Sequence, residues 1–395
     1  MGSLRAWTTL LLVSALFFII TAATFTSLGL ALNAMVPALH WNYGEAGAGF
    51  SLLAVLCGIT STVPAALIRR IGVRANFLIG AAVMALAFWA LAATRSLPLY
   101  FLGTALAGFG FSLLATVPGT YLLTRLFARP AFAFGLYFTI GGLGGVAGPP
   151  LYFWLAGPGN DWRAFWIGMG AAVVLTALAT ALFSSTGSDL ASDEADPQIS
   201  AEGWTARAAM RTGQFAFLAI AYTAFLIAGI TANATSVVHL TEHGVRAETA
   251  GYLMSVEAAV NAAARFLGGL LNAVTGARTL LAVALLALVV GLLALSFGRS
   301  LPALLVYAAG IGIGYGLAFF ASTILLLDYF GRRPNLELFA MVNLISTVGA
   351  AAPALAGLTR DHAGSFIPFY LLLAVLMAAI AAVALLLKKP HLAPP

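Results

Sequence analysis

One long internal repeat constrains the fold of this chain more than any other feature. Residues 46–153 and 250–357 align at a constant separation of 204 positions, so that Arg95-Ser96-Leu97-Pro98 recurs as Arg299-Ser300-Leu301-Pro302. Glycines and prolines recur at the same separation, among them the pairs Gly72 and Gly276, Gly108 and Gly312, and Pro149 and Pro353. The repeat predicts two copies of one structural unit within the chain.

Twelve apolar runs fill the two copies, and most are at least as long as the roughly 20 residues that a helix needs to cross a bilayer. Hydrophobic residues make up 62% of the 395 positions and charged residues 8%, a balance too apolar for a water-soluble protein. We therefore predict an all-α membrane protein with twelve transmembrane helices arranged as two parallel six-helix repeats. The runs are 8–36, 44–69, 75–94, 98–126, 131–156, 163–184, 212–239, 247–273, 279–298, 300–327, 336–359 and 365–387.

A polar segment separates the two copies. Between 185 and 211 the chain is rich in Ser, Asp and Glu and ends with Arg207 and Arg211, the composition of a solvated linker. We predict an N-terminal bundle over 1–184, a cytoplasmic linker over 185–211, and a C-terminal bundle with a short tail over 212–395. The first run is interpreted as a retained span and not a signal peptide, because the seventh run would otherwise lack its repeat partner.

Basic residues are divided between the two sides of the predicted membrane. Five fall on one side, namely Arg95, Arg163, Arg246, Arg299 and Arg360. Because Lys and Arg concentrate in cytoplasmic loops, the larger group places both termini in the cytoplasm, and we expect a bacterial inner (plasma) membrane. This distribution also explains the net charge of +6 without a nucleic-acid partner. The larger group is Arg5, Arg69, Arg70, Arg74, Arg125, Arg129, Arg207, Arg211, Arg278, Arg332, Arg333, Lys388 and Lys389.

Enzyme signatures are missing from the sequence. There is one cysteine, Cys57, no His/Asp/Glu spacing typical of a metal site, no phosphate-binding loop after a strand, and no nucleophile beside a base at membrane depth. We expect no catalytic residues, no metal, no cofactor and no enzymatic activity. The expected partners are the lipid bilayer and small molecules, and the expected state is a monomer.

The eighth run carries the most informative polar residues. Glu257, Asn261 and Arg265 are spaced by four and therefore share one face of a helix. The repeat counterpart of Arg265 is Ser61, so the scaffold does not require a cation there, and an arginine at the bilayer centre costs about 2.5–3.5 kcal/mol on insertion scales. The guanidinium fork suits a carboxylate, which predicts an organic anion as ligand. An internal Glu257–Arg265 ion pair and a gating contact of Arg265 with another helix are the alternatives.

Five further intramembrane residues are candidates for lining a substrate cavity. Asn and Tyr also join helices by hydrogen bonds, so a structural role stays open for each. They are Asn33, Asn233, Tyr137, Tyr315 and Asn343.

The loop between the second and third runs carries a recognisable motif. Residues 65–74, Ala-Ala-Leu-Ile-Arg-Arg-Ile-Gly-Val-Arg, and their copy at 269–278 resemble the signature Gly-x-Leu-x-Asp-Arg-x-Gly-x-Arg of the major facilitator superfamily. The resemblance implies a secondary transporter working by alternating access. Arg69 stands where the family usually has Asp.

The eighth run resembles one branch of that superfamily, the monocarboxylate and oxalate porters. The shared stretch is Glu257-x-x-x-Asn261-x-x-x-Arg265-Phe266-x-Gly268-Gly269, and the resemblance implies that Arg265 binds substrate. Asn261 occupies the position of the acid that commonly precedes this arginine, so the resemblance implies either that the proton-coupling acid is lost or that Glu257, one turn earlier, has this role. We take Glu257 as the candidate. The eleventh run lacks lysine, which favours one carboxylate over two. The expected activity is proton symport of a monocarboxylate.

Two other functions are the alternatives to this transport activity. Gly135, Gly144, Gly148 and Pro149 match part of a glycine-proline pattern that resembles the one in drug/proton antiporters, which would imply an exporter of amphipathic compounds. Close helix packing also explains these glycines. A membrane sensor that signals through the linker without transporting is the alternative from another class.

Overall fold

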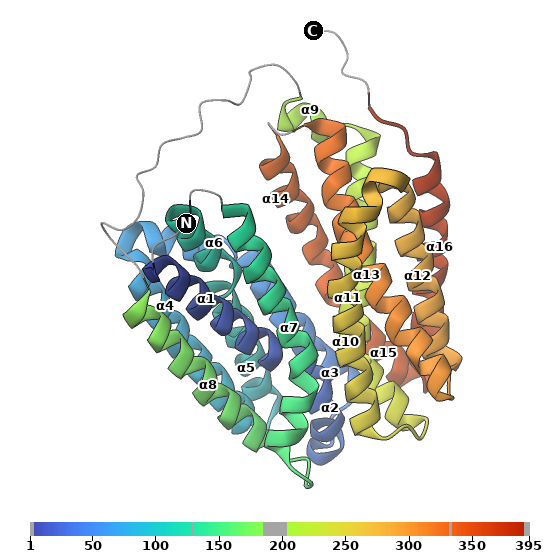
Figure 1. The fold of residues 1–395 in the computed structure, drawn as a ribbon. Coiled ribbons are helices and arrows are strands. Elements are labelled where there is room, and N and C mark those ends of the chain that lie inside the picture. The colour runs from blue at the N-terminus through green and yellow to red at the C-terminus, as the bar shows by residue number, and fades with distance from the viewer. Residues whose placement is uncertain (1–3, 128–129, 185–203, 332–333, 391–395) are drawn as a thin grey trace. The chain divides into compact units, whose positions relative to one another are not determined.

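The computed structural model describes residues 4–127, 130–184, 204–331 and 334–390, and every regular element within these ranges is helical (Figure 1). The first half contains α1 (Leu4–Ala23), α2 (Phe25–Leu39), α3 (Tyr43–Ile59), α4 (Val63–Ala92), α5 (Leu97–Leu114), α6 (Thr116–Leu126), α7 (Pro130–Ala156) and α8 (Trp162–Phe183). The second half contains α9 (Ala206–Met210), α10 (Gly213–Glu242), α11 (Ala247–Thr275), α12 (Ala277–Phe297), α13 (Leu301–Phe330), α14 (Asn335–Ser346), the 3-10 turn η2 (Thr347–Ala351), α15 (Ala352–Ala363) and α16 (Ile367–Leu386).

The helices confirm the predicted membrane fold. Within the described chain, nine helical segments are long and apolar enough to cross a membrane, and each corresponds to one predicted run. The second, fifth and eighth runs correspond to α3, α7 and α11. Of the predicted linker, residues 185–203 lie outside the described residues, as do Arg129, Arg332 and Arg333, and α9 lies in the remainder.

The repeat is visible in the backbone. Helices α3 and α11 begin at Tyr43 and Ala247, 204 positions apart, as Pro98 and Pro302 are in the first turns of α5 and α13. Gly72 interrupts α4 with a φ of 84°, and its counterpart Gly276 precedes α12 with a φ of 76°. Because L-residues rarely adopt this left-handed region, glycine is required at the same bend in both halves.

The predicted boundary between the second and third runs was wrong. The apolar run 44–69 ends as a helix at Ile59, and residues 63–71 form the first part of α4, up to the bend at Gly72. Pro64 stands in the first turn of α4, where its missing N–H is tolerated and where it cannot extend the preceding helix. Runs 8–36 and 98–126 each form one candidate span, Leu4–Leu39 and Leu97–Leu123, with a local departure from helical geometry at Thr24 and at Ala115. Continuous hydrophobicity does not reveal these breaks.

The chain forms two compact units. The first comprises Met1–Asp193, Asn233–Ser255 and Pro353–Asp361, and in it α4 packs against α5 and α8 while α1 packs against α7 (Figure 1). The second comprises Glu194–Ala232, Val256–Ala352 and His362–Pro395, and in it α12 packs against α13 and α16. Helices α10 and α11 thus contribute to both units. The domain boundaries predicted from the sequence stay a prediction.

The bend at Gly276 can be tested by substitution. Gly276→Ala is expected to lower the thermal-unfolding midpoint of the purified protein in detergent, because an alanine at positive φ costs about 1 kcal/mol. Gly142→Ala serves as the control, since Gly142 lies within helix α7 with no atom within 4 Å of its added Cβ. Equal midpoints for the two variants would contradict the assignment.

Candidate functional site

Helix α11 carries Glu257, Asn261 and Arg265, and α13 crosses α11 closely at the first two of these residues. A Cβ atom at Gly312 of α13 would lie 2.5 Å from the backbone oxygen of Glu257, and one at Gly316 would overlap the backbone oxygen of Asn261. Small residues spaced by four let two membrane helices approach backbone to backbone. The two glycines therefore fix the height and rotation of Glu257 and Asn261 against α13.

The first half of the chain uses the same crossing without charges. At Gly108, the repeat counterpart of Gly312, a Cβ atom would overlap the backbone oxygen of Leu53, which is the counterpart of Glu257. Ser112 replaces Gly316, and its Oγ donates to the backbone oxygen of Cys57 at 2.7 Å. Leucine and cysteine thus occupy the places of glutamate and asparagine in an equivalent contact. The polar residues of α11 are not needed for the helix crossing.

Arg265 lies one turn beyond Asn261. Its Nε donates to Oδ1 of Asn261 at 2.9 Å, and its guanidinium carbon lies 4.5 Å from the ring centroid of Phe319 and 5.9 Å from that of Tyr315. Cation–π contacts at these distances hold a guanidinium in place. The side chain remains exposed, and among the described residues no carboxylate lies within ion-pairing distance of it. The terminal nitrogens of Arg265 are therefore available to a ligand.

Glu257 has a different partner. It is 5% exposed, and the hydroxyl of Tyr307 on α13 donates to its Oε2 at 3.3 Å. Within the part of the chain that the structure describes, the internal Glu257–Arg265 ion pair does not form. Two helical turns separate the two residues by about 12 Å along the axis, and each side chain is held by neighbours at its own level.

An aromatic wall continues from Arg265 across the second unit. Tyr222 of α10 lies 6.1 Å from Phe319 and 6.1 Å from Phe339 of α14, measured between ring centroids. The hydroxyl of Tyr222 donates to Oδ1 of Asn343 at 3.3 Å, and Asn343 is exposed. Arg265, Asn261, Tyr315 and Asn343 thus belong to one cluster formed by α10, α11, α13 and α14.

Sequence reasoning missed three members of this cluster, namely Tyr222, Phe319 and Phe339. Phe319 follows Tyr315 by four residues, and this spacing could have placed it on the same face of α13. Tyr222 and Phe339 gave no comparable signal, because aromatic residues are common in the apolar runs.

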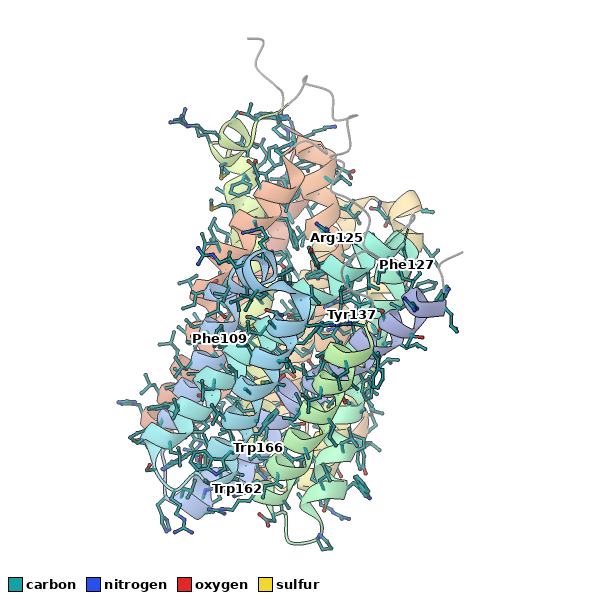
Figure 2. All side chains as sticks on the ribbon, turned by 90° about the vertical axis from the view of Figure 1, so that its left-hand side faces the viewer. Phe109, Arg125, Phe127, Tyr137, Trp162 and Trp166 are labelled. Atoms are coloured by element: carbon teal, nitrogen blue, oxygen red, sulfur yellow. The ribbon has the colours of Figure 1, made fainter. Side chains whose placement is uncertain are left out.

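Three predicted residues, Asn33, Asn233 and Tyr137, belong to the first unit, where each contacts neighbouring residues. Oδ1 of Asn33 accepts from the hydroxyl of Thr241 at 2.7 Å, and the backbone oxygen of Asn233 packs against Gly29. Tyr137 is fully buried among the helices (Figure 2) and donates to the backbone oxygen of Ala115 at 2.8 Å. Their ligand-binding roles stay predictions.

The glycines of α7 pack against α1. A Cβ atom at Gly144 would overlap the backbone oxygen of Phe18, and one at Gly148 would lie 3.0 Å from that of Ala22. Close helix contact accounts for both glycines without a transport-specific role.

Comparison with known proteins identifies the architecture. A family model described as Major Facilitator Superfamily matches residues 12–241 and 218–395. The structure of the nucleoside transporter NupG, in a mutant form, matches with a TM-score of 0.78 at 14% identity, covering 96% of this chain and 99% of that one. A bacterial homolog of the human lysosomal transporter Spinster, inward-facing and unoccupied, matches with a TM-score of 0.76 at 16% identity, covering 97% and 98%. Its inward-facing and occupied form gives 0.75 at 17% identity, covering 97% of each chain. None of the curated proteins matches the sequence.

The crossing of α11 and α13 yields a stability prediction. Gly316→Ala is expected to lower the thermal-unfolding midpoint by the equivalent of about 1–3 kcal/mol, because the new methyl group forces the two backbones apart. The control is Gly269→Ala on α11, whose added Cβ meets its nearest neighbour at 4.0 Å. A midpoint for Gly316→Ala as high as that of the control would show that the contact is looser than described.

Proposed function

Because the chain belongs to the Major Facilitator Superfamily and is therefore a membrane transporter, we propose that it moves a small organic anion, a monocarboxylate, by alternating access coupled to protons. The observation that carries this proposal is the exposed guanidinium of Arg265, held by an amide and by aromatic rings and lacking an acidic partner in the described structure. A cation that has no ion-pair partner on a membrane helix favours the binding of an anionic ligand.

The geometry around Arg265 suits a carboxylate. Asn261 engages Nε and Phe319 covers one face of the guanidinium plane, so the two terminal nitrogens point away from Asn261. An arginine presents these nitrogens as a fork that donates two parallel hydrogen bonds to one carboxylate. Asn261 acts as a positioning residue, since it fixes the side chain whose other end binds the substrate.

The surroundings favour a substrate with one charge and an apolar body. Tyr315 and Phe319, both partly exposed, present aromatic surface beside the guanidinium, and such surfaces bind apolar groups. The buried Tyr222 packs against Phe319. The polar group at the far end of this wall is the neutral amide of Asn343. A second carboxylate would meet no second cation among these residues, which supports a monocarboxylate.

Glu257 is the proposed proton carrier. Its carboxyl group is buried beside Tyr307. An unpaired ionised carboxylate is very costly to bury, whereas a neutral, hydrogen-bonded carboxyl group costs far less. Uptake of one proton together with one carboxylate lets the carrier reorient without moving net charge. Tyr307 positions the carboxyl group.

The compared structures support the fold and do not assign a substrate. NupG is a nucleoside transporter and the Spinster homolog is related to a lysosomal transporter, but at 14–17% identity the likeness extends to the fold alone. Export of amphipathic compounds and sensing without transport predict different results in binding and counterflow assays.

Arg265 provides the first test. Purified parent protein is screened by thermal shift against a panel of labelled monocarboxylates, and hits are followed by counterflow in proteoliposomes. Arg265→Ala is expected to reduce uptake at least about 100-fold and Arg265→Lys about tenfold, because lysine retains the charge but not the fork.

Arg246→Ala is the matched control, since Arg246 is a surface residue paired with Glu248 at 3.3 Å. Uptake by Arg265→Ala at the rate of this control would rule out carboxylate binding by Arg265. Ligand binding by the parent without counterflow would favour a sensor.

Glu257 provides the second test. Glu257→Gln mimics the protonated acid. This variant is expected to retain counterflow and to lose the accumulation of substrate that an inward-directed proton gradient (acidic outside) drives. Tyr307→Phe is expected to change the pH dependence of accumulation and to leave counterflow at a fixed pH nearly unchanged. If Glu257→Gln still concentrates substrate in response to the gradient, another group carries the proton.

A further inference from the structure

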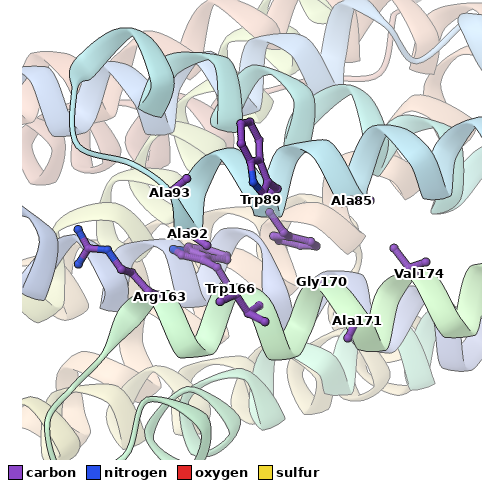
Figure 3. A pocket seen from close by; sticks show the side chains of 11 residues that line it. Ala85, Trp89, Ala92, Ala93, Arg163, Trp166, Gly170, Ala171 and Val174 are labelled. Carbon is purple, nitrogen blue, oxygen red and sulfur yellow. The ribbon is translucent and has the colours of Figure 1, made fainter.

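A groove opens between α4 and α8 on the surface of the first unit, away from the residues discussed above. Its volume is about 510 Å³, within the range of about 300–1,000 Å³ that is common for small-molecule sites. Trp89 of α4 and Trp166 of α8 line it, with Arg163 at one end and Val174 at the other (Figure 3). We propose that this α4–α8 groove binds an anionic phospholipid.

The groove faces hydrocarbon. Trp89 and Ile167 on its rim are 62% and 65% exposed, and the neighbouring Leu86 and Leu175 are exposed as well. Apolar surface of this kind on a membrane-spanning helix meets lipid chains and not water. The floor is rigid, because Phe88 and Trp166 stack at 5.6 Å and Gly170 places no side chain there.

The length of the groove matches one leaflet. On α8 it runs from Arg163 to Val174, about 16 Å at 1.5 Å per residue. Half of a hydrocarbon core about 30 Å thick is about 15 Å. The groove begins at the end of the span, since α8 starts at Trp162 and α4 ends at Ala92. An acyl chain lying in it would place its headgroup beside Arg163.

The charges at this end favour a phosphate. Arg163 lies over the ring of Trp162 at 3.9 Å and donates from Nη2 to the backbone oxygen of Thr94 at 3.3 Å, and no carboxylate in the described chain forms an ion pair with it. Arg95, the next residue after Thr94, is exposed. The nearby acid, Asp161, accepts from the backbone N–H of Arg163 at the start of α8. Two arginines against one acid leave a net positive mouth, which complements an anionic headgroup.

The test uses the full-length protein, delipidated in detergent and examined by native mass spectrometry with palmitoyl-oleoyl phosphatidylglycerol or phosphatidylcholine. The parent is expected to retain phosphatidylglycerol about fivefold more than phosphatidylcholine. This ratio corresponds to a free energy of about 1 kcal/mol, the contribution of one basic residue near an anionic membrane surface. Arg163→Gln is expected to reduce this ratio to about one. Ala171→Phe, which fills the exposed groove from its lining, is expected to lower retention of both lipids.

Arg299→Gln is the matched control, because Arg299 also donates to backbone oxygens beside the start of a span, at 2.8 and 3.2 Å, but does not line the groove. Equal retention of the two lipids by the parent would overturn the proposal, as would a preference that survives Arg163→Gln or is lost equally in Arg299→Gln. A lipid-free dimer that Ala171→Phe dissociates would assign the groove to a second copy of the chain.

Discussion

The close approach of α11 and α13 is the contact on which the candidate site depends. Gly312 and Gly316 bring the α13 backbone against the carbonyl oxygens of Glu257 and Asn261. With the two helices locked at this distance, Tyr307 reaches the carboxyl group of Glu257 and Tyr315 and Phe319 reach the guanidinium of Arg265. A larger residue at either glycine would move every one of these groups, because they share a single pair of backbones.

The two halves of the internal repeat make this contact with different side chains. In the first half the same crossing is made by Gly108 against Leu53 and by Ser112 against Cys57, and it is complete without a charge. The second half retains the backbone contact and replaces its apolar side chains with an acid and an amide, followed by a cation. Since a charge within a membrane is expensive, this asymmetry supports the proposal that the second half binds the substrate.

Distance along α11 separates two roles. Glu257 and Arg265 stand on one helix face but about 12 Å apart, so the acid is buried beside Tyr307 while the guanidinium remains exposed beside Phe319. Neither charge cancels the other directly. The acid and the guanidinium therefore stand at different levels of the same helix, and the buried Tyr222 packs against Phe319 beside the guanidinium.

The amino-acid sequence by itself determined the all-helical membrane fold, the repeat with its recurring glycines, and the unusual position of Arg265, because hydropathy, fixed spacing and the cost of buried charge act locally along the chain. It misplaced the helix end within run 44–69, since an unbroken apolar run hides a break. Only the tertiary structure decided that Arg265 is held by Asn261, Phe319 and Tyr315, that Glu257 pairs with Tyr307, and that Tyr222 joins the cluster. These partners come from helices distant in sequence, and their choice depends on how deeply one helix packs into the groove of another.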